Sequence, residues 1–254
     1  MKKIFLPLAL ALAINSYADF KIESSAFKDM CCFPSKYNLC SAAKKGRIKM
    51  SNDISPPLSW SDAPQQTQSF VMLMTDPDAI NSPNFDLPNH YFAKDAPRVT
   101  VYQWILVNIP KDLTSLPEGA GSKGYVLGGK PVGQTPYGLT GMNIYTEATK
   151  SQYASRIEPG VKEPKKAEGI YGGYDGGCPP WNDAMPHHYT FTIYALDVKE
   201  LDLPKDGMFK GEDVLKAMEG HVLAKAEIVA LYSTNPTVVK KERCPCRRYK
   251  LDQK

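Results

Sequence analysis

The chain has 254 residues, of which 43% are hydrophobic and 23% charged, and its formal net charge is +4. This length fits one large domain with a sizeable core, or two small ones. The charge is close to neutral, which argues against a general nucleic-acid-binding protein. The basic excess lies partly in the segment KKERCPCRRYK near the C-terminus. This segment is typical of a solvated tail, with contact to an anionic partner as the alternative.

Residues 1–18 have the three parts of a secretory signal peptide: two lysines, the apolar core IFLPLALALAI, and a small-residue cleavage site, SYA. The apolar core is too short to span a bilayer. We therefore expect cleavage near Ala18 and export of residues 19–254, as a single domain, to the periplasm or the exterior.

The six cysteines are Cys31, Cys32, Cys40, Cys178, Cys244 and Cys246. An even number of cysteines in an exported chain indicates disulfides. Adjacent Cys31 and Cys32 bond each other badly, and so do Cys244 and Cys246 across one proline. Bridges between these groups are therefore expected, although the sequence does not give the connectivity. A metal site is the alternative, disfavoured because the chain lacks a C-x2-C pair.

The first elements in chain order are a turn and a strand. NDISPPLSW (52–60) predicts a rigid, structural turn anchored by Trp60. SFVMLMT (69–75) is an almost continuous apolar run, as in a strand buried on both faces.

Two acids, Asp76 and Asp78, follow this strand on either side of Pro77. The proline restricts its own φ and biases Asp76 towards an extended conformation, so both carboxylates can project together. They predict a ligand site at a strand end, or alternatively the capping of a turn. A D-x-D metal clamp is a further option, but it needs a nucleotide-binding α/β context that this chain lacks.

The middle of the chain combines one strand with two long loops. VYQWILVNI (101–109) predicts a second buried strand. The loops cover residues 78–100 and 142–170, and loops of this length are usually functional or disordered. Part of the second loop, TEATKSQYASRI, has a helical alternative.

A glycine- and proline-rich stretch at 171–186 precedes His187 and His188. Glycines let a backbone approach a ligand closely, and exposed N–H groups beside an imidazole suit an anion. Adjacent histidines on a strand face opposite ways, so one of the two is expected to reach such a site. A structural role for both is the alternative.

The C-terminal third predicts two strands, at 188–196 and 226–232, and a helix at 211–223. The first strand alternates, with Tyr189 and Phe191 on one face. The helix has an apolar stripe that consists of Val214, Leu215, Met218 and Val222. The chain is therefore mostly β with few helices.

Six stretches carry a family resemblance: NDISPPLSW, TDPDA, QWILVNIP, YDGGCPP, HHYTFTIYALD and GHVLAKAEIVALY. In this order they resemble the phosphatidylethanolamine-binding protein family, which includes the Raf kinase inhibitor proteins, and the signal peptide points to an exported bacterial branch. The resemblance implies a central β-sheet flanked by a smaller sheet, with a C-terminal helix. It also implies a shallow pocket for an anion such as phosphate or a phospholipid head group.

The pocket residues implied by the matching motifs are Asp76, Asp78, Gln103, Tyr174, Gly176, Cys178, Pro179, His187 and Tyr189. Gln103 stands where the family usually has histidine, so the pocket lacks one cation for phosphate. We expect Gly176 and Gly177 to offer N–H groups to the anion, and His187 to gain its proton near pH 6–7. The loop 142–170 is longer than usual, and whether it covers the pocket stays open.

These features predict a non-enzymatic binding protein, because no nucleophile–base pair is visible in the sequence. The expected partner is a small anion or a phospholipid head group, with no cofactor, metal, catalytic residue or nucleic acid. The alternative is an exported inhibitor of a protein target, such as a peptidase, that acts through surface loops.

Overall fold

The computed structural model describes residues 19–43, 48–80, 91–148 and 168–241. The expected signal peptide, Cys244 and Cys246 lie outside these residues, as does most of the loop 142–170.

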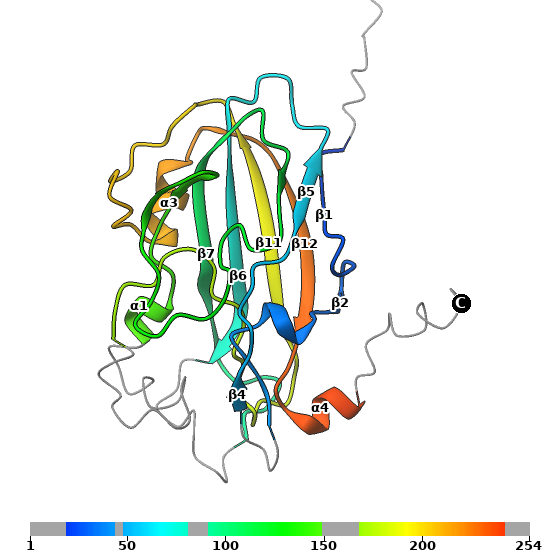
Figure 1. Cartoon of the computed structure of the whole chain (residues 1–254). Coiled ribbons are helices and arrows are strands. Elements are labelled where there is room, and N and C mark those ends of the chain that lie inside the picture. Colours follow the sequence, from blue (N-terminus) through cyan, green and yellow to red (C-terminus); the bar gives the residue numbers. More distant parts are fainter. Residues whose placement is uncertain (1–18, 44–47, 81–90, 149–167, 242–254) are drawn as a thin grey trace, which may run out of the picture.

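The described residues form three antiparallel or mixed sheets, as expected for a mostly β protein (Figure 1). The large sheet has seven strands in the order β2 (Cys31–Cys32), β12 (Val222–Tyr232), β11 (His187–Leu196), β6 (Ser69–Ile80), β7 (Arg98–Pro110), β10 (Gly138–Thr140) and β9 (Gly133–Thr135). A three-stranded sheet contains β1 (Lys21–Glu23), β5 (Leu58–Ser61) and β8 (Ser115–Leu116), and a two-stranded sheet contains β3 (Cys40–Ala42) and β4 (Ile48–Met50). The described helices are η1 (Ser35–Tyr37), α1 (Tyr145–Ala148), α3 (Gly211–Ala217) and α4 (Pro236–Lys241).

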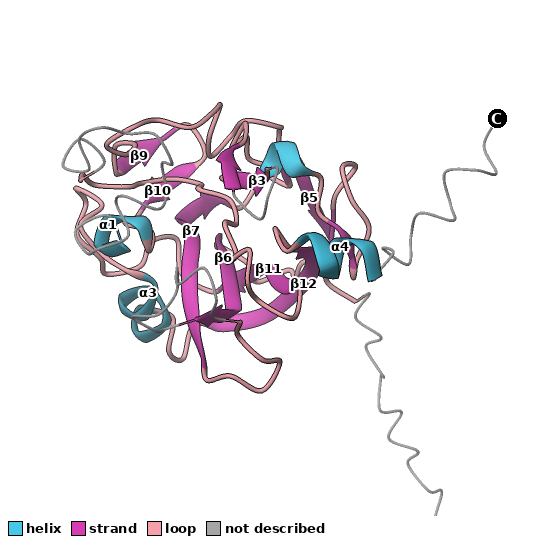
Figure 2. Ribbon diagram, turned by 90° about the horizontal axis from the view of Figure 1, so that it is seen from below, coloured by secondary structure: helices cyan, strands magenta, loops and turns pink. Residues whose placement is uncertain are grey.

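Alternation along the central strands divides the core into two layers. Met72 and Met74 of β6 pack with Trp60 and Phe191 on the side of the three-stranded sheet. Their neighbours Val71 and Leu73 face the opposite side, where residues of α3 complete a second cluster. Seen from below in Figure 2, α1 and α3 accordingly lie on one side of the large sheet and β5 on the other.

The predicted strands are present, and they extend beyond the apolar runs. β6 continues through Asp76 and Asp78 to Ile80, so the acids lie within a strand and not after its end. Register shifts interrupt its pairing with β7 at three places, including the segment from Asp76 to Ala79. Such bulges re-aim side chains locally, which accommodates Pro77 in the strand.

The helix expected at 211–223 is shorter than predicted. α3 ends at Ala217, and Val222 already belongs to β12, where 44% of it is exposed. Val214 and Met218 are buried as predicted, but Leu215 is exposed. Gly220 adopts a left-handed conformation with φ of 79°, which ends the helical segment and turns the chain into the strand.

Among the described residues, no helix has the length and apolar character needed to cross a membrane.

Candidate ligand-binding site

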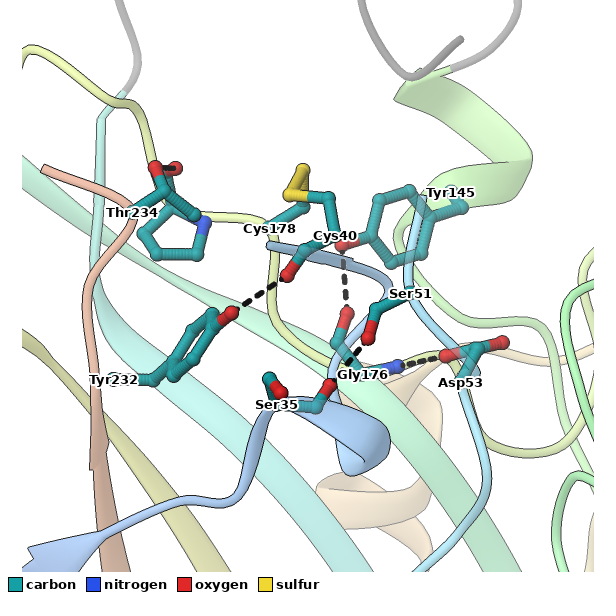
Figure 3. Close-up of a disulfide and its surroundings, with 10 residues drawn as sticks. Ser35, Cys40, Ser51, Asp53, Tyr145, Gly176, Cys178, Tyr232 and Thr234 are labelled. Atoms are coloured by element: carbon teal, nitrogen blue, oxygen red, sulfur yellow. Dashed lines mark hydrogen bonds between the residues drawn. A yellow bond between two sulfur atoms is a disulfide. The ribbon is translucent and has the colours of Figure 1, made fainter. Parts of the chain in front are cut away.

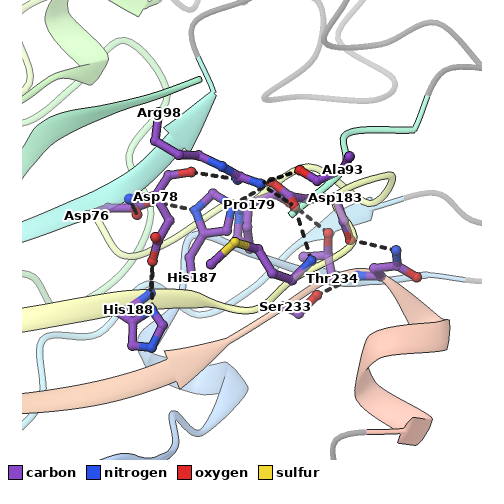
Figure 4. Close-up of polar contacts among 12 residues, drawn as sticks. Asp76, Asp78, Ala93, Arg98, Pro179, Asp183, His187, His188, Ser233 and Thr234 are labelled. Carbon is purple, nitrogen blue, oxygen red and sulfur yellow. Dashed lines mark hydrogen bonds and ion pairs between the residues drawn. The ribbon is translucent and has the colours of Figure 1, made fainter. Parts of the chain in front are cut away.

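A buried aspartate–histidine pair joins β6 to the start of β11 (Figure 4). Antiparallel pairing aligns Thr75 of β6 with Thr190 of β11, so Asp76, the next residue of β6, lies level with the first residues of β11. Oδ2 of Asp76 is 2.7 Å from Nδ1 of His187, and both side chains are almost fully buried. The other oxygen, Oδ1, accepts the backbone N–H of Asp78 at 2.9 Å.

Asp183 and Arg98 extend this pair into a chain of four charged side chains (Figure 4). Nε2 of His187 is 3.1 Å from Oδ2 of Asp183. The Arg98 guanidinium contacts both oxygens of the same carboxylate, with Nη2 at 3.1 Å from Oδ1 and Nη1 close to Oδ2. Both ring nitrogens of His187 are therefore occupied by carboxylates of the protein.

The two carboxylates hold His187 in its charged form. Burial disfavours the imidazolium, but attraction to Asp76 and hydrogen bonds with Asp183 and Asp76 outweigh burial and raise the pKa of His187 from 6.5 to about 9. The expected gain of a proton near pH 6–7 is therefore wrong, because the ring is already protonated at neutral pH. Burial also opposes the charge on Asp183, yet hydrogen bonds from His187 and Arg98 lower the pKa of that carboxyl.

A second aspartate–histidine pair lies closer to the surface. Oδ2 of Asp78 is 2.7 Å from Nδ1 of His188 and also accepts the backbone N–H of His188 at 2.8 Å. The His188 side chain is 35% exposed and that of Asp78 15%. The two histidines thus face different aspartates, as their adjacent positions in a strand predict. Nη1 of Arg98 donates to the Asp78 carbonyl at 2.9 Å and links the inner and outer pairs.

Gln103 and Tyr189 are buried, and each has a polar atom without a hydrogen-bond partner among the described residues. These atoms are Oε1 of Gln103 and the Tyr189 hydroxyl. The Tyr189 ring stacks beside that of His187 with 6.3 Å between centroids. Gln103 lies in β7, and its carbonyl accepts the backbone N–H of Asp175 at 3.1 Å. Buried polar atoms without a partner are uncommon in proteins, and a functional role is one explanation for those that occur.

The glycine- and proline-rich loop is held by the protein itself (Figure 3). The N–H of Gly176 donates to Oδ1 of Asp53 at 2.7 Å. The expectation that this N–H is offered to an anion is therefore wrong. A Cβ at Gly177 would lie 2.2 Å from the Tyr189 ring, which leaves no space for a ligand between them. Tyr174 is fully buried in the core against Trp104 and is not a wall of an open pocket.

Two further contacts hold the same loop. The Pro179 carbonyl accepts the Thr234 hydroxyl at 2.7 Å. Cys178 forms a disulfide with Cys40 across a sequence separation of 138 residues, which confirms the expectation that the chain contains disulfides. Cys31 and Cys32 are disulfide-bonded as well, which removes their thiolates from the alternative of a metal site. The described residues contain no group of three or more His, Cys, Asp or Glu that could hold a metal ion.

A separate buried ionic cluster includes Asp175 of the same loop, and the sequence carries no signal of its ionic contacts. Nζ of Lys130 is 3.0 Å from Asp53 and 2.5 Å from Asp175, and both carboxylates are almost fully buried. The second oxygen of Asp175 accepts Nδ2 of Asn143 at 2.7 Å. Burial and repulsion by Asp175 raise the pKa of Asp53 well above its ordinary value, despite the lysine.

Comparisons with known proteins agree with this fold. Residues 23–233 match the family model described as phosphatidylethanolamine-binding protein. A UPF0098 protein of Methanothermobacter thermautotrophicus is 31% identical over 211 residues, which cover 83% of this chain and 97% of that protein. The UPF0098 protein YbhB of Escherichia coli is 29% identical over 72% of this chain and 83% of its own length.

Two solved structures are similar as well. A putative phosphatidylethanolamine-binding protein homologue from Chlamydia trachomatis superposes with a TM-score of 0.53 at 26% identity, over 85% of this chain and 97% of that chain. YbcL of Escherichia coli, described as a new member of the mammalian family, has a TM-score of 0.55 at 24% identity, covers 85% of this chain and 99% of its own, and supports the fold alone. The family model and these relatives support a binding protein, and the chain belongs to the phosphatidylethanolamine-binding protein family.

Proposed function

We propose that the protein is a non-enzymatic binding protein for a phospholipid head group that carries both a phosphate and an ammonium group, such as phosphoethanolamine. The ligand meets the outer end of the charged chain, at Asp78 and His188. The observation that carries this proposal is the partly exposed Asp78–His188 pair beside the Arg98 guanidinium.

The charge of the site favours a zwitterion over a free anion. Asp76, Asp78 and Asp183 supply three carboxylates, whereas His187 and Arg98 supply two cations that these acids already neutralise. A doubly charged free phosphate would meet a site with a net negative charge. A head group with an ammonium compensates this excess, because the partly exposed Asp78 carboxylate is an acceptor for the ammonium beside the phosphate.

His188 is the residue suited to the phosphate. Its Nδ1 faces Asp78, so Nε2 is the ring nitrogen directed away from the carboxylate, and the ring is 35% exposed. Asp78 orients this ring in the same way that an aspartate orients a histidine in other polar sites. Because Nδ1 donates to the carboxylate, Nε2 is a donor to phosphate in the protonated ring, and in that state the pair presents an acceptor and a donor side by side.

A binding role suits the inner pair better than catalysis. Both nitrogens of His187 contact carboxylates, so neither is paired with a hydroxyl or thiol that it could activate. The Cys40–Cys178 disulfide supports an oxidising compartment, and with the signal-peptide pattern it favours a periplasmic or exterior protein.

Calorimetry with phosphoethanolamine, inorganic phosphate and ethanolamine tests the proposal. We expect phosphoethanolamine to bind the wild-type protein with a Kd on the order of 1 mM, about −4 kcal/mol, and at least about tenfold more tightly than either fragment. His188→Gln should weaken this binding about tenfold, since it removes the ring nitrogen that meets the phosphate.

His221→Gln is the matched control. His221 also pairs with an aspartate, at 2.9 Å from Asp197, and is partly exposed, but it lies in the turn before β12, away from the site. This variant should bind phosphoethanolamine like the wild type. If phosphate alone binds as tightly as phosphoethanolamine, or if phosphoethanolamine does not bind at all, the head-group proposal is wrong. In the second case an inhibitor of an exported protein becomes the better reading.

A further inference from the structure

The Asp183 carboxylate lies between two cations, the His187 imidazolium and the Arg98 guanidinium. Oδ2 contacts both Nε2 of His187, at 3.1 Å, and Nη1 of Arg98. Oδ1 accepts Nη2 of Arg98 and the backbone N–H of Met185, each at 3.1 Å. The side chain is fully buried. Figure 4 shows the carboxylate between the guanidinium and the imidazole ring.

This arrangement is how proteins bind the anionic group of a small molecule. A guanidinium that contacts both oxygens of one carboxylate, supported by a backbone N–H and a protonated imidazole, is a strong and specific anion site. Here the anion belongs to the chain itself. We propose that Asp183 is a built-in anionic ligand that fills the inner anion position and thereby makes the site reject free anions.

The backbone fixes Asp183 in this position. Its N–H donates to the Pro180 carbonyl at 3.2 Å, and its carbonyl accepts Nδ2 of Asn235 at 2.6 Å. On the other side, Phe92 forms a bridge with Asp183, with Ala184 donating to its carbonyl at 2.9 Å. The carboxylate is therefore preorganised by three separate segments and does not behave as a displaceable lid.

Asp183 then determines specificity for the proposed function. With the inner position filled, the phosphate of a ligand has to bind at the outer pair, Asp78 and His188. Only the placement of the ligand phosphate at the outer pair rests on the proposed function. The filling of the inner position follows from the contacts of Asp183 alone.

Chemical rescue tests the proposal with formate, the smallest carboxylate. Asp183→Ala leaves a carboxylate-sized space between two buried cations. We expect this variant to bind formate at least about tenfold more tightly than the wild type. The imidazole ¹⁵N resonances of His187 should shift when formate is added to the variant and should stay unchanged in the wild type. Equal formate binding by both proteins would overturn the proposal.

Two controls sharpen this test. Asp197→Ala removes the carboxylate from the exposed pair with His221, and it should gain no formate binding. Asp183→Asn removes the charge but leaves no space, so formate should not bind it either. Formate binding by these controls as tight as that by Asp183→Ala would show that the inner position is not special.

A folding defect does not remove the test. The proposal is supported if Asp183→Ala folds in a chloride-free buffer that contains formate but does not fold in the same buffer without formate. If it folds in neither, the wild-type protein decides, because inorganic phosphate should leave the His187 Nε2 resonance unchanged. A phosphate-dependent shift of this resonance would mean that Asp183 does not hold the position. Phosphoethanolamine binding by the wild type is a separate measurement, so either proposal can fail without the other.

Discussion

Two buried ionic clusters each include one aspartate of the same loop, and they differ in how they connect to the rest of the protein. In the first, Lys130 is shared by Asp53 and Asp175. In the second, His187 is shared by Asp76 and Asp183, and Arg98 joins through Asp183. In each, a cation contacts two carboxylates that come from distant parts of the chain.

The difference lies in the connection to the surface. The Lys130 cluster ends in the Asn143 amide and the Gly176 N–H, both of which are buried, so its polar groups are satisfied internally. The His187 cluster continues through Arg98 to Asp78 and the partly exposed His188. The first cluster therefore fixes the loop, whereas the second reaches the surface where we propose that the ligand binds. Similar ionic chemistry has a structural role in one place and the proposed binding role in the other.

The largest expected effect comes from breaking the structural cluster. Lys130→Met leaves two buried carboxylates without their cation and should lower the free energy of unfolding by about 3–5 kcal/mol. Urea denaturation at neutral pH measures this loss. Lys225→Met is the control, because the exposed Lys225–Glu227 pair should contribute less than about 1 kcal/mol. Equal effects of the two substitutions would contradict the structural role of Lys130.

A pH-dependent loss of stability should come from the second cluster. The pKa of His187 is raised in the folded protein from 6.5 to about 9, so folding favours its protonated form. This contribution is complete below pH 6.5 and is lost as the pH rises to about 9. The shift corresponds to about 3 kcal/mol.

His187→Gln should remove that part of the pH dependence, since glutamine does not titrate. Urea denaturation of both proteins at several pH values across this interval measures the difference. Parallel stability curves for the wild type and the variant would show that His187 does not hold a proton in this range.

The smallest expected effect on stability is at the outer pair. His188→Gln should change the free energy of unfolding by less than about 1 kcal/mol, because the ring is partly exposed and solvent screens the pair. The same variant is expected to lose head-group binding, so calorimetry and denaturation should separate the two properties. A large loss of stability with normal binding would reverse the roles assigned to the inner and outer pairs.

Local patterns in the sequence explain what could be predicted. The apolar runs of β6 and β7 and the alternation of β11 have clear periodicities, and the family motifs include Asp76, Asp78 and His187. Gly220 indicates the end of α3, but the apolar stripe continues to Val222 and therefore predicts a longer helix than the structure has.

The charged partners could not be predicted in the same way. Arg98 and Asp183 are separated by 85 residues, and Lys130 and Asp53 by 77. Each is a single charged residue in a polar segment or at its end, where no periodicity distinguishes a buried ion pair from a solvated side chain. Their pairing is a property of the folded sheet and its loops. For the same reason, the sequence does not reveal that the Gly176 N–H is occupied. Its acceptor, Asp53, lies in a distant segment that predicts only a structural turn.

The protonation state of His187 is the central claim, because it decides whether the inner site is already neutralised. An NMR pH titration of the ¹⁵N-labelled imidazole, with His187→Gln to assign the signal, measures it directly. The structure predicts a ring with both nitrogens protonated at neutral pH and a pKa of about 9. A neutral ring at pH 7.5, titrating at or below the ordinary value of 6.5, would contradict the account.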